Sequence, residues 1–385
     1  MRNQIRKNCI FFPKYLLRCL GINFYENESV SYKIYSFIAI ILIVSYPWNS
    51  LHSIYHHLDN FDLMINGCFN MFGAVSATFK ALTMLYHRGI FRKVLRTIAD
   101  AQEEQNVYRT TQGYIYRLNK IVICGSLCYY LFLGLLYMIS LYGRLTLPCE
   151  EWRTPILDVT LLNITYSPNY EVAYVYEVLS VYLVSSIVCF SNVLITTILI
   201  DMTVQFKLFR NCIRNNFKSL NDQNKSWTIL QRFLKDIVER HLSLIDLMQQ
   251  IEMACSKLVL IDVLANLLII CFSCYYASVL PLFDSKAFQA YFEVVVVSLS
   301  QFSMSYFGTQ LSVASQSIAD TCYELDFIGT DIRFQKGLLI VMRRSVKPLY
   351  ITVGGFSMLS ITVFVMIMKN SYSFLMVLRS TNNLA

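Results

Sequence analysis

The feature that most constrains the fold is a recurrence of apolar runs about as long as a bilayer is thick. A helix of roughly 20 apolar residues crosses the hydrocarbon core of a membrane, and runs near that length with few charges recur along the 385 residues. Only 15% of the residues are charged and 55% are hydrophobic, whereas soluble domains carry about 25% charged residues. The sequence therefore predicts an all-α, polytopic membrane protein.

A hydropathy window predicts seven transmembrane helices. The fourth and seventh segments are longer than a perpendicular crossing needs, so they are expected to tilt or to extend into the cytoplasm. The seven segments are Tyr32–Leu51, Leu63–Tyr86, Ile121–Tyr142, Val172–Ile200, Leu258–Leu282, Phe292–Ala314 and Leu349–Leu378.

The loop charges predict the orientation, because cytoplasmic loops are enriched in Lys and Arg. The N-terminal segment and every second loop together hold 26 basic residues, and the opposite set holds four. The N-terminus is therefore expected to be cytoplasmic and the C-terminus extracellular. An N-glycosylation sequon at Asn163 falls in a loop that this count places outside, which agrees with the assignment.

Several other functions find little support in the sequence. The net charge of +8 is explained by topology and by attraction to anionic lipid, so nucleic acid is not an expected partner. Cys271 and Cys274 have the spacing of a redox or zinc motif but lie inside an apolar span, where packing is the simpler role. His52, His56 and His57 are more consistent with a solvated cluster than with a metal site. We find no catalytic constellation, and we predict no enzyme activity, no cofactor and no metal.

Ionisable residues inside the spans are candidates for function, because they are costly in lipid. Lys80 and Asp262 lie toward the inner ends of their spans, and Glu177 and Glu293 lie toward the outer ends. Solvation at the membrane edges explains these four most simply. Lys369 is the exception, because it falls near mid-membrane in the last span.

Polar side chains recur on one face of that last span. Thr362, Lys369 and Ser373 share a face at helical spacing, and either an aqueous path or hydrogen bonds to neighbouring helices would satisfy them. Leu375 and Leu378 are candidates for a hydrophobic constriction that closes a pore by dewetting.

Aromatic side chains gather in the outer halves of the middle spans. An apolar cavity with a few hydroxyl groups would suit a small, weakly polar ligand, although tyrosines also form belts at membrane boundaries. The candidate ligand-binding residues are Phe69, Phe72, Tyr130, Leu133, Tyr137, Tyr174, Val178 and Tyr182.

The C-terminal third contains IADTCYELDF and the segment from Asp331 to Ser380, which includes Lys347-Pro348, Gly354 and the sequence KNSYSF from Lys369. These segments resemble the closing region of insect odorant receptors. Phe327, Val346 and Phe374 depart from residues common in the family. The ending also differs from that of the shared co-receptor, so the chain resembles a ligand-tuned subunit.

The resemblance implies an odorant-gated, non-selective cation channel in the plasma membrane of a sensory neurone, in its dendrite. Such a channel is a heterotetramer of tuning and co-receptor subunits, passes monovalent and divalent cations, and opens when a small volatile molecule binds in the outer half of the helix bundle. The seventh span lines the pore in this family.

The predicted spans and loops divide the chain into six regions, to which the resemblance adds the pocket, anchor and pore roles. Residues 1–31 form a basic, amphipathic cytoplasmic segment, and residues 32–200 hold helices one to four with the ligand-pocket region. The remaining regions are a cytoplasmic helical loop (201–257), helices five and six (258–314), a cytoplasmic anchor segment (315–348), and the pore-lining seventh helix with a short extracellular tail (349–385).

Three other classes of multi-helix membrane protein fit the sequence less well. A G-protein-coupled receptor would place its N-terminus outside, which the loop charges contradict. A transporter would usually show repeated, broken helices, and no internal repeat is visible. A gustatory-type receptor channel has a similar architecture and stays the nearest alternative, against which the KNSYSF ending argues.

Overall fold

The protein is a bundle of long helices. The computed structural model describes residues 11–24, 29–59, 61–103, 167–220, 226–281 and 285–382, together with single positions between 131 and 146. The helices of these ranges are α2 (Phe11–Cys19), α3 (Val30–His56), α4 (Phe61–Tyr86), α5 (Arg88–Glu103), α7 (Asn169–Lys218), α8 (Trp227–Val279), α9 (Ser285–Tyr323), α10 (Ile332–Ser345) and α11 (Ile361–Asn382).

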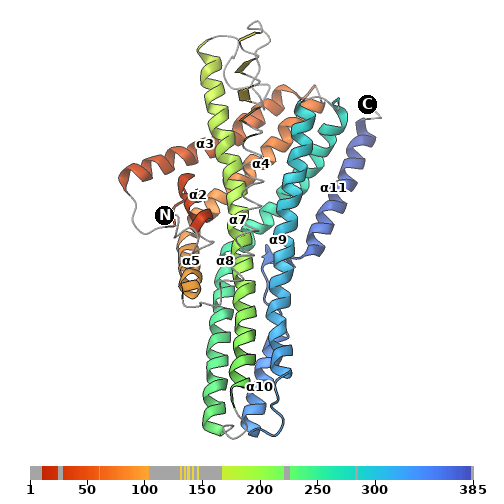
Figure 1. Ribbon diagram of the computed structural model, residues 1–385. Coiled ribbons are helices and arrows are strands. Elements are labelled where there is room, and N and C mark those ends of the chain that lie inside the picture. The colour runs from red at the N-terminus through yellow and green to blue at the C-terminus, as the bar shows by residue number, and fades with distance from the viewer. Residues whose placement is uncertain are drawn as a thin grey trace.

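Three long helices form the centre of the bundle. α7 packs along α9, and α8 packs against both α4 and α9. In Figure 1 these helices run through the height of the molecule, with α3, α4 and α11 around the upper part and α10 at the lower end. Residues 191–206 of α7 are all buried. A helix that is buried on every side lies in the core of a bundle, so α7 is its axis.

The outer helix α3 has the reverse of the pattern seen in soluble proteins. Its buried side carries small and polar side chains such as Asn49, Ser50 and Ser53, whereas Phe37 and Trp48 are exposed. Apolar side chains on the outside are stable where the surroundings are lipid, and small residues allow helices to approach closely. The burial of α3 is therefore that of a helix in a membrane.

A proline inside α3 is accommodated by its neighbour. Pro47 has no N–H, so the carbonyl of Ile43, four residues earlier, loses its helical donor. The hydroxyl of Thr78 on α4 lies 3.2 Å from that carbonyl oxygen and 2.9 Å from the carbonyl oxygen of Ala74. A hydroxyl from a packed helix can satisfy a backbone group that lipid could not.

The described residues contain five helices that are long and apolar enough to cross a membrane, namely α3, α4 from Leu63, α7, α8 and α11 up to Ser380. α9, with 39 residues, contains the sixth predicted span but is more polar. Most of the third predicted span, Ile121–Tyr142, lies outside the described residues.

The structure corrects the start of the seventh predicted segment. The sequence predicts a helix from Leu349, but β1 (Thr352–Val353) and β2 (Ser357–Met358) form an antiparallel hairpin there, and α11 begins at Ile361. Gly354 and Gly355 turn the chain with φ angles of +62° and +85°, a conformation that favours glycine. A hydropathy window detects the apolar residues of this stretch but not the turn.

The hairpin is held by α8. The Glu252 carboxylate accepts hydrogen bonds from the backbone N–H of Thr352 at 2.8 Å and from its hydroxyl group. The N–H of Gly354 donates to the carbonyl of Ser256 at 3.1 Å. On the other side, the hydroxyl of Thr309 on α9 accepts from the N–H of Ile361 at 3.0 Å. The α8 contacts thus fix the hairpin, and the α9 contact fixes the first turn of α11.

Aromatic side chains join the lower ends of α7, α8 and α10. Phe217, Phe233 and Phe334 form a cluster with ring centroids 5.9–6.3 Å apart. His241 stacks on Phe209 at 5.9 Å. Burial, and to a smaller extent the nearby Arg344 guanidinium, lower the pKa of His241 to about 4. The imidazole is therefore neutral at physiological pH and packs as an aromatic ring.

We expect Gly308→Ala to destabilise the protein by about 1–3 kcal/mol, as overpacking does. A Cβ atom at Gly308 on α9 would lie 2.6 Å from the carbonyl oxygen of Leu359 and would push the start of α11 away. Thermal unfolding of the detergent-solubilised protein measures the loss. Gly89→Ala is the control, because a Cβ atom there meets nothing within 4 Å; an equal effect of both substitutions would contradict the close packing at Gly308.

Candidate functional site

The upper half of the bundle encloses a cavity of about 360 Å³. Residues of α3, α4, α7, α8 and α9 line it, from Tyr46 on α3 to Ser303 on α9. Cavities that bind small molecules have volumes of roughly 300–1,000 Å³, so this one suits a small ligand.

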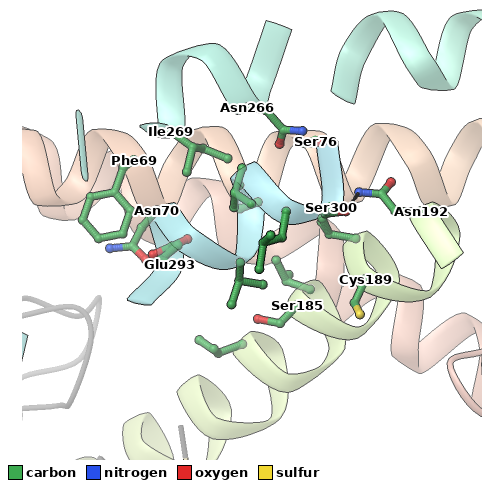
Figure 2. A pocket seen from close by; sticks show the side chains of 18 of the residues that line it. Phe69, Asn70, Ser76, Ser185, Cys189, Asn192, Asn266, Ile269, Glu293 and Ser300 are labelled. Carbon is green, nitrogen blue, oxygen red and sulfur yellow. Dashed lines mark hydrogen bonds between the residues drawn. The ribbon is translucent and has the colours of Figure 1, made fainter. Parts of the chain in front are cut away.

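Most of the cavity wall is aliphatic, and two groups of polar side chains lie at opposite ends. Val181, Val184, Val188, Val296, Val297 and Ile269 provide much of the apolar surface. Figure 2 shows Asn70 and Glu293 beside Phe69 at one end, and Asn192 and Ser300 at the other. The cavity can therefore hold an apolar body and interact with a polar group at its ends.

A buried ion pair lies at the Asn192 end. The Lys80 ammonium on α4 pairs with the Asp262 carboxylate on α8, and both side chains are at most 1% exposed. Lys80 Nζ also donates to Asn192 Oδ1 of α7 at 2.7 Å, and Asn192 Nδ2 donates to Ser300 Oγ of α9 at 3.2 Å. One polar network thus joins the four helices α4, α7, α8 and α9.

This network corrects the expectation that Lys80 and Asp262 are solvated at the membrane edge. The two charges instead satisfy each other inside the bundle. Desolvation of two charges is costly, and their attraction offsets it only with good geometry and additional hydrogen bonds. Asn192 provides such bonds. Hydropathy could not pair the two residues, because 182 positions separate them in the chain.

α8 brings the cavity next to α11. Asn266 lines the cavity and donates to Gln301 Oε1 of α9 at 2.9 Å. The carbonyl of the adjacent residue, Leu267, accepts a hydrogen bond from the hydroxyl of Ser371 on α11 at 3.0 Å. Neighbouring residues of α8 therefore contact the cavity and the last helix.

Of the eight predicted ligand-binding residues, Phe69 lies on the wall of this cavity. Phe72 stacks against Phe272 at 5.8 Å, and Val178 is partly buried against the core. Tyr130 and Leu133 lie outside the described residues.

The other three predicted residues form an aromatic cluster. The ring of Tyr137 lies 6.0 Å from both the Tyr174 and the Tyr182 ring, and the Tyr174 hydroxyl donates to the Tyr137 carbonyl at 2.8 Å. None of the three belongs to the lining of the 360 Å³ cavity described above. The structure brings them together with one another rather than with Phe69.

Sequence reasoning missed most of the polar lining. Asn70, Asn192, Asn266 and Ser300 are isolated polar residues within apolar segments, which is the signal that could have identified them. The sequence predicts that Glu293 is solvated at the membrane edge, whereas the residue lies on the cavity wall.

The predicted pore residues fall on two sides of α11. Thr362, Lys369 and Ser373 are exposed on the side that faces away from the bundle. Leu375 and Leu378 are partly buried and pack against the cluster of Ile65, Phe69 and Tyr275. The polar stripe and the two leucines thus do not share one face in the single chain.

The remaining sequence candidates show no metal chemistry in the part of the chain that is described. No group of three or more potential metal ligands occurs there. His52 and His56 pack edge to face at 4.5 Å, and Cys271 and Cys274 are free thiols in α8. Asn163 lies outside the described residues.

The fold is shared with a family of membrane receptors. Residues 60–372 match the family described as 7tm Odorant receptor. Because the match covers most of the chain, the protein belongs to this odorant receptor family, whose members are receptors rather than enzymes.

Individual relatives are distant. The chain is 25% identical over 191 residues to putative odorant receptor 92a and 25% identical over 201 residues to odorant receptor 94a, both of Drosophila melanogaster. These matches cover 50% and 51% of this chain and 46% and 51% of the relatives. The chain thus spans about half the length of the curated relatives it matches.

Solved structures share the fold over almost the whole chain. The insect olfactory receptor OR5 from Machilis hrabei, in complex with eugenol, superimposes with a TM-score of 0.80 at 14% identity, covering 97% of both chains. The structure of OR5 described without that ligand gives a TM-score of 0.77 at 13% identity, covering 96% of this chain and 97% of OR5.

We expect Asp262→Asn to cost about 3–5 kcal/mol, because it leaves the Lys80 charge buried without its partner. The double variant Lys80→Met/Asp262→Leu removes both charges and is expected to recover most of this loss. Thermal unfolding of the solubilised protein reports both effects.

The exposed Arg214–Glu324 pair provides the control. Arg214→Gln should change stability by less than about 1 kcal/mol, as is typical of surface pairs. A double variant at Lys80 and Asp262 that is as unstable as Asp262→Asn would show that the cost does not arise from an unpaired charge.

Proposed function

We propose that this chain is the ligand-tuned subunit of an odorant-gated, non-selective cation channel. It assembles with a co-receptor as a heterotetramer in the plasma membrane of a sensory neurone, with its N-terminus in the cytoplasm. A small volatile ligand binds in the cavity of the outer half of the bundle and opens a central pore lined by α11. Membership of the odorant receptor family supports the receptor role.

One observation carries the proposal: of two adjacent residues on α8, one lines the cavity and the other binds α11. Asn266 lines the cavity, and the Leu267 carbonyl holds Ser371 of α11. A second contact runs through Phe69, which lines the cavity and belongs to the cluster on which Leu375 and Leu378 pack. A ligand that alters the packing of these residues acts directly on the helix assigned to the pore.

The ligand opens the channel only if it binds the open state more tightly than the closed one, because equal affinity for both states leaves their populations unchanged. Glu252 holds the hairpin before α11, and Thr309 holds the first turn of α11, so movement at that end is limited. We therefore assign the gating movement to the outer half of α11, beyond Ser371.

The side of α11 that faces away from the bundle supports its assignment to the pore. Thr362, Lys369 and Ser373 are exposed there, and polar groups at membrane depth require protein or water around them. A water-filled path along the axis between subunits would surround these groups with water. The Lys369 charge lies toward this axis and would weaken the attraction for cations, so the co-receptor subunits contribute the stronger cation path.

The proposal is tested by current recordings from cells that make this chain with a co-receptor, while G-protein signalling is blocked. We expect some members of a volatile-odorant panel to evoke a cation current that needs both subunits. Cells with the co-receptor alone are the control. A response that disappears with the G-protein block would instead indicate a G-protein-coupled receptor.

Cysteine substitutions distinguish the two sides of α11. During ligand-evoked currents, a membrane-impermeant thiol reagent applied from outside should inhibit Ser373→Cys and leave Leu378→Cys unaffected, because Leu378 packs on the bundle. The unsubstituted chain, which has twelve native cysteines, provides the baseline. Inhibition of Leu378→Cys alone would assign the pore to the leucine side and would support the predicted constriction.

A further inference from the structure

Glu293 is an acidic side chain on the wall of an otherwise apolar cavity. It lies on α9, and within the described ranges its carboxyl group has neither a hydrogen bond nor an ion pair. An ionised carboxylate in apolar surroundings is costly unless it is paired. The family assignment does not explain why an acidic residue occupies this position, and among the described residues no cation pairs with it.

The neighbouring Asn70 leaves an acceptor rather than a donor for the cavity. Asn70, next to Glu293 in Figure 2, uses its amide nitrogen on Asn66, donating to the carbonyl oxygen at 2.9 Å and to Oδ1 at 3.3 Å. The Oδ1 atom of Asn70 is thus the group left for a ligand. The ring of Phe69 lies at the same end, and an aromatic face attracts cations.

The opposite end of the cavity offers less to a ligand. Asn192 already bonds to Lys80 and Ser300, and Asn266 bonds to Gln301. Among the described lining residues Glu293 is the charged one, so recognition of a charged ligand group falls to this end. A carboxylate, a carbonyl oxygen and an aromatic face together match a group that carries positive charge and several N–H donors.

We propose that the cavity recognises a small amine, with its ammonium group on Glu293 and Asn70 and its hydrocarbon body along the valines of α7 and α9. This inference rests on the proposed function and specifies the ligand class of the same cavity. The ammonium forms a charge-assisted hydrogen bond with the carboxylate, which is stronger than a neutral one. Esters, ketones and hydrocarbons have no donor for this end, and alcohols have one.

The test uses two pairs of probes with matched carbon skeletons: hexylamine with hexanol, and phenethylamine with phenethyl alcohol. Currents are recorded from cells that make the full chain with a co-receptor. We expect each amine to be more potent than its alcohol. Glu293→Gln should reduce the potency of the amines by about ten- to a hundredfold, the range expected for a hydrogen bond to a charged group, and should change alcohol potency little.

Glu239→Gln is the matched control, because Glu239 is an exposed acid on α8, paired with Lys235 at 3.6 Å. It should leave all four potencies unchanged. A second readout does not depend on channel opening: hexylamine should raise the unfolding temperature of the purified chain, and Glu293→Gln should remove this increase while the variant itself stays folded.

The outcomes separate the two levels of the proposal. Currents evoked by alcohols or other odorants but not by amines, or equal potency of the amines on Glu293→Gln and the unsubstituted chain, would overturn the amine inference and leave the proposed function intact. The absence of current with every odorant would overturn the proposed function. In that case the unfolding temperature with hexylamine still decides whether the cavity binds an amine through Glu293.

Discussion

The bundle depends on one buried ion pair, between Lys80 and Asp262. The pair and its partner Asn192 join α4, α7 and α8, and Ser300 extends the network to α9. In lipid, apolar side chains provide little force between helices, so association relies on close packing and on hydrogen bonds. Four helices that share one polar network are held in a fixed register, and the cavity lies where these helices separate.

α8 connects the parts of the protein that the proposed function requires. Its 53 residues carry the hairpin contact at Glu252, the buried charge of Asp262, the cavity residue Asn266 and the carbonyl of Leu267 that binds α11. A change at one of these points reaches the others through a continuous helix. Under the proposed function, this arrangement would let a small ligand in the upper bundle act on α11 without touching its polar face.

The sequence allowed much of the fold to be predicted, but less of the site. The apolar runs predicted the membrane helices, because length and hydropathy follow directly from bilayer thickness. Hydropathy did not predict the hairpin at Gly354, because two glycines in an apolar stretch change its mean hydropathy little. For the cavity, Phe69 was expected and lies on the wall, whereas Tyr137, Tyr174 and Tyr182 form a cluster of their own.

By itself, the sequence determined that the chain is helical and suited to a membrane, and its C-terminal third indicated the odorant receptor family. These properties are encoded in local composition and order. The tertiary structure decided which isolated polar residues meet: Lys80 pairs with Asp262, and Glu293 faces a cavity with no partner among the described residues. Such pairings join residues far apart in the chain, and only the packing of the helices brings their side chains within reach of one another.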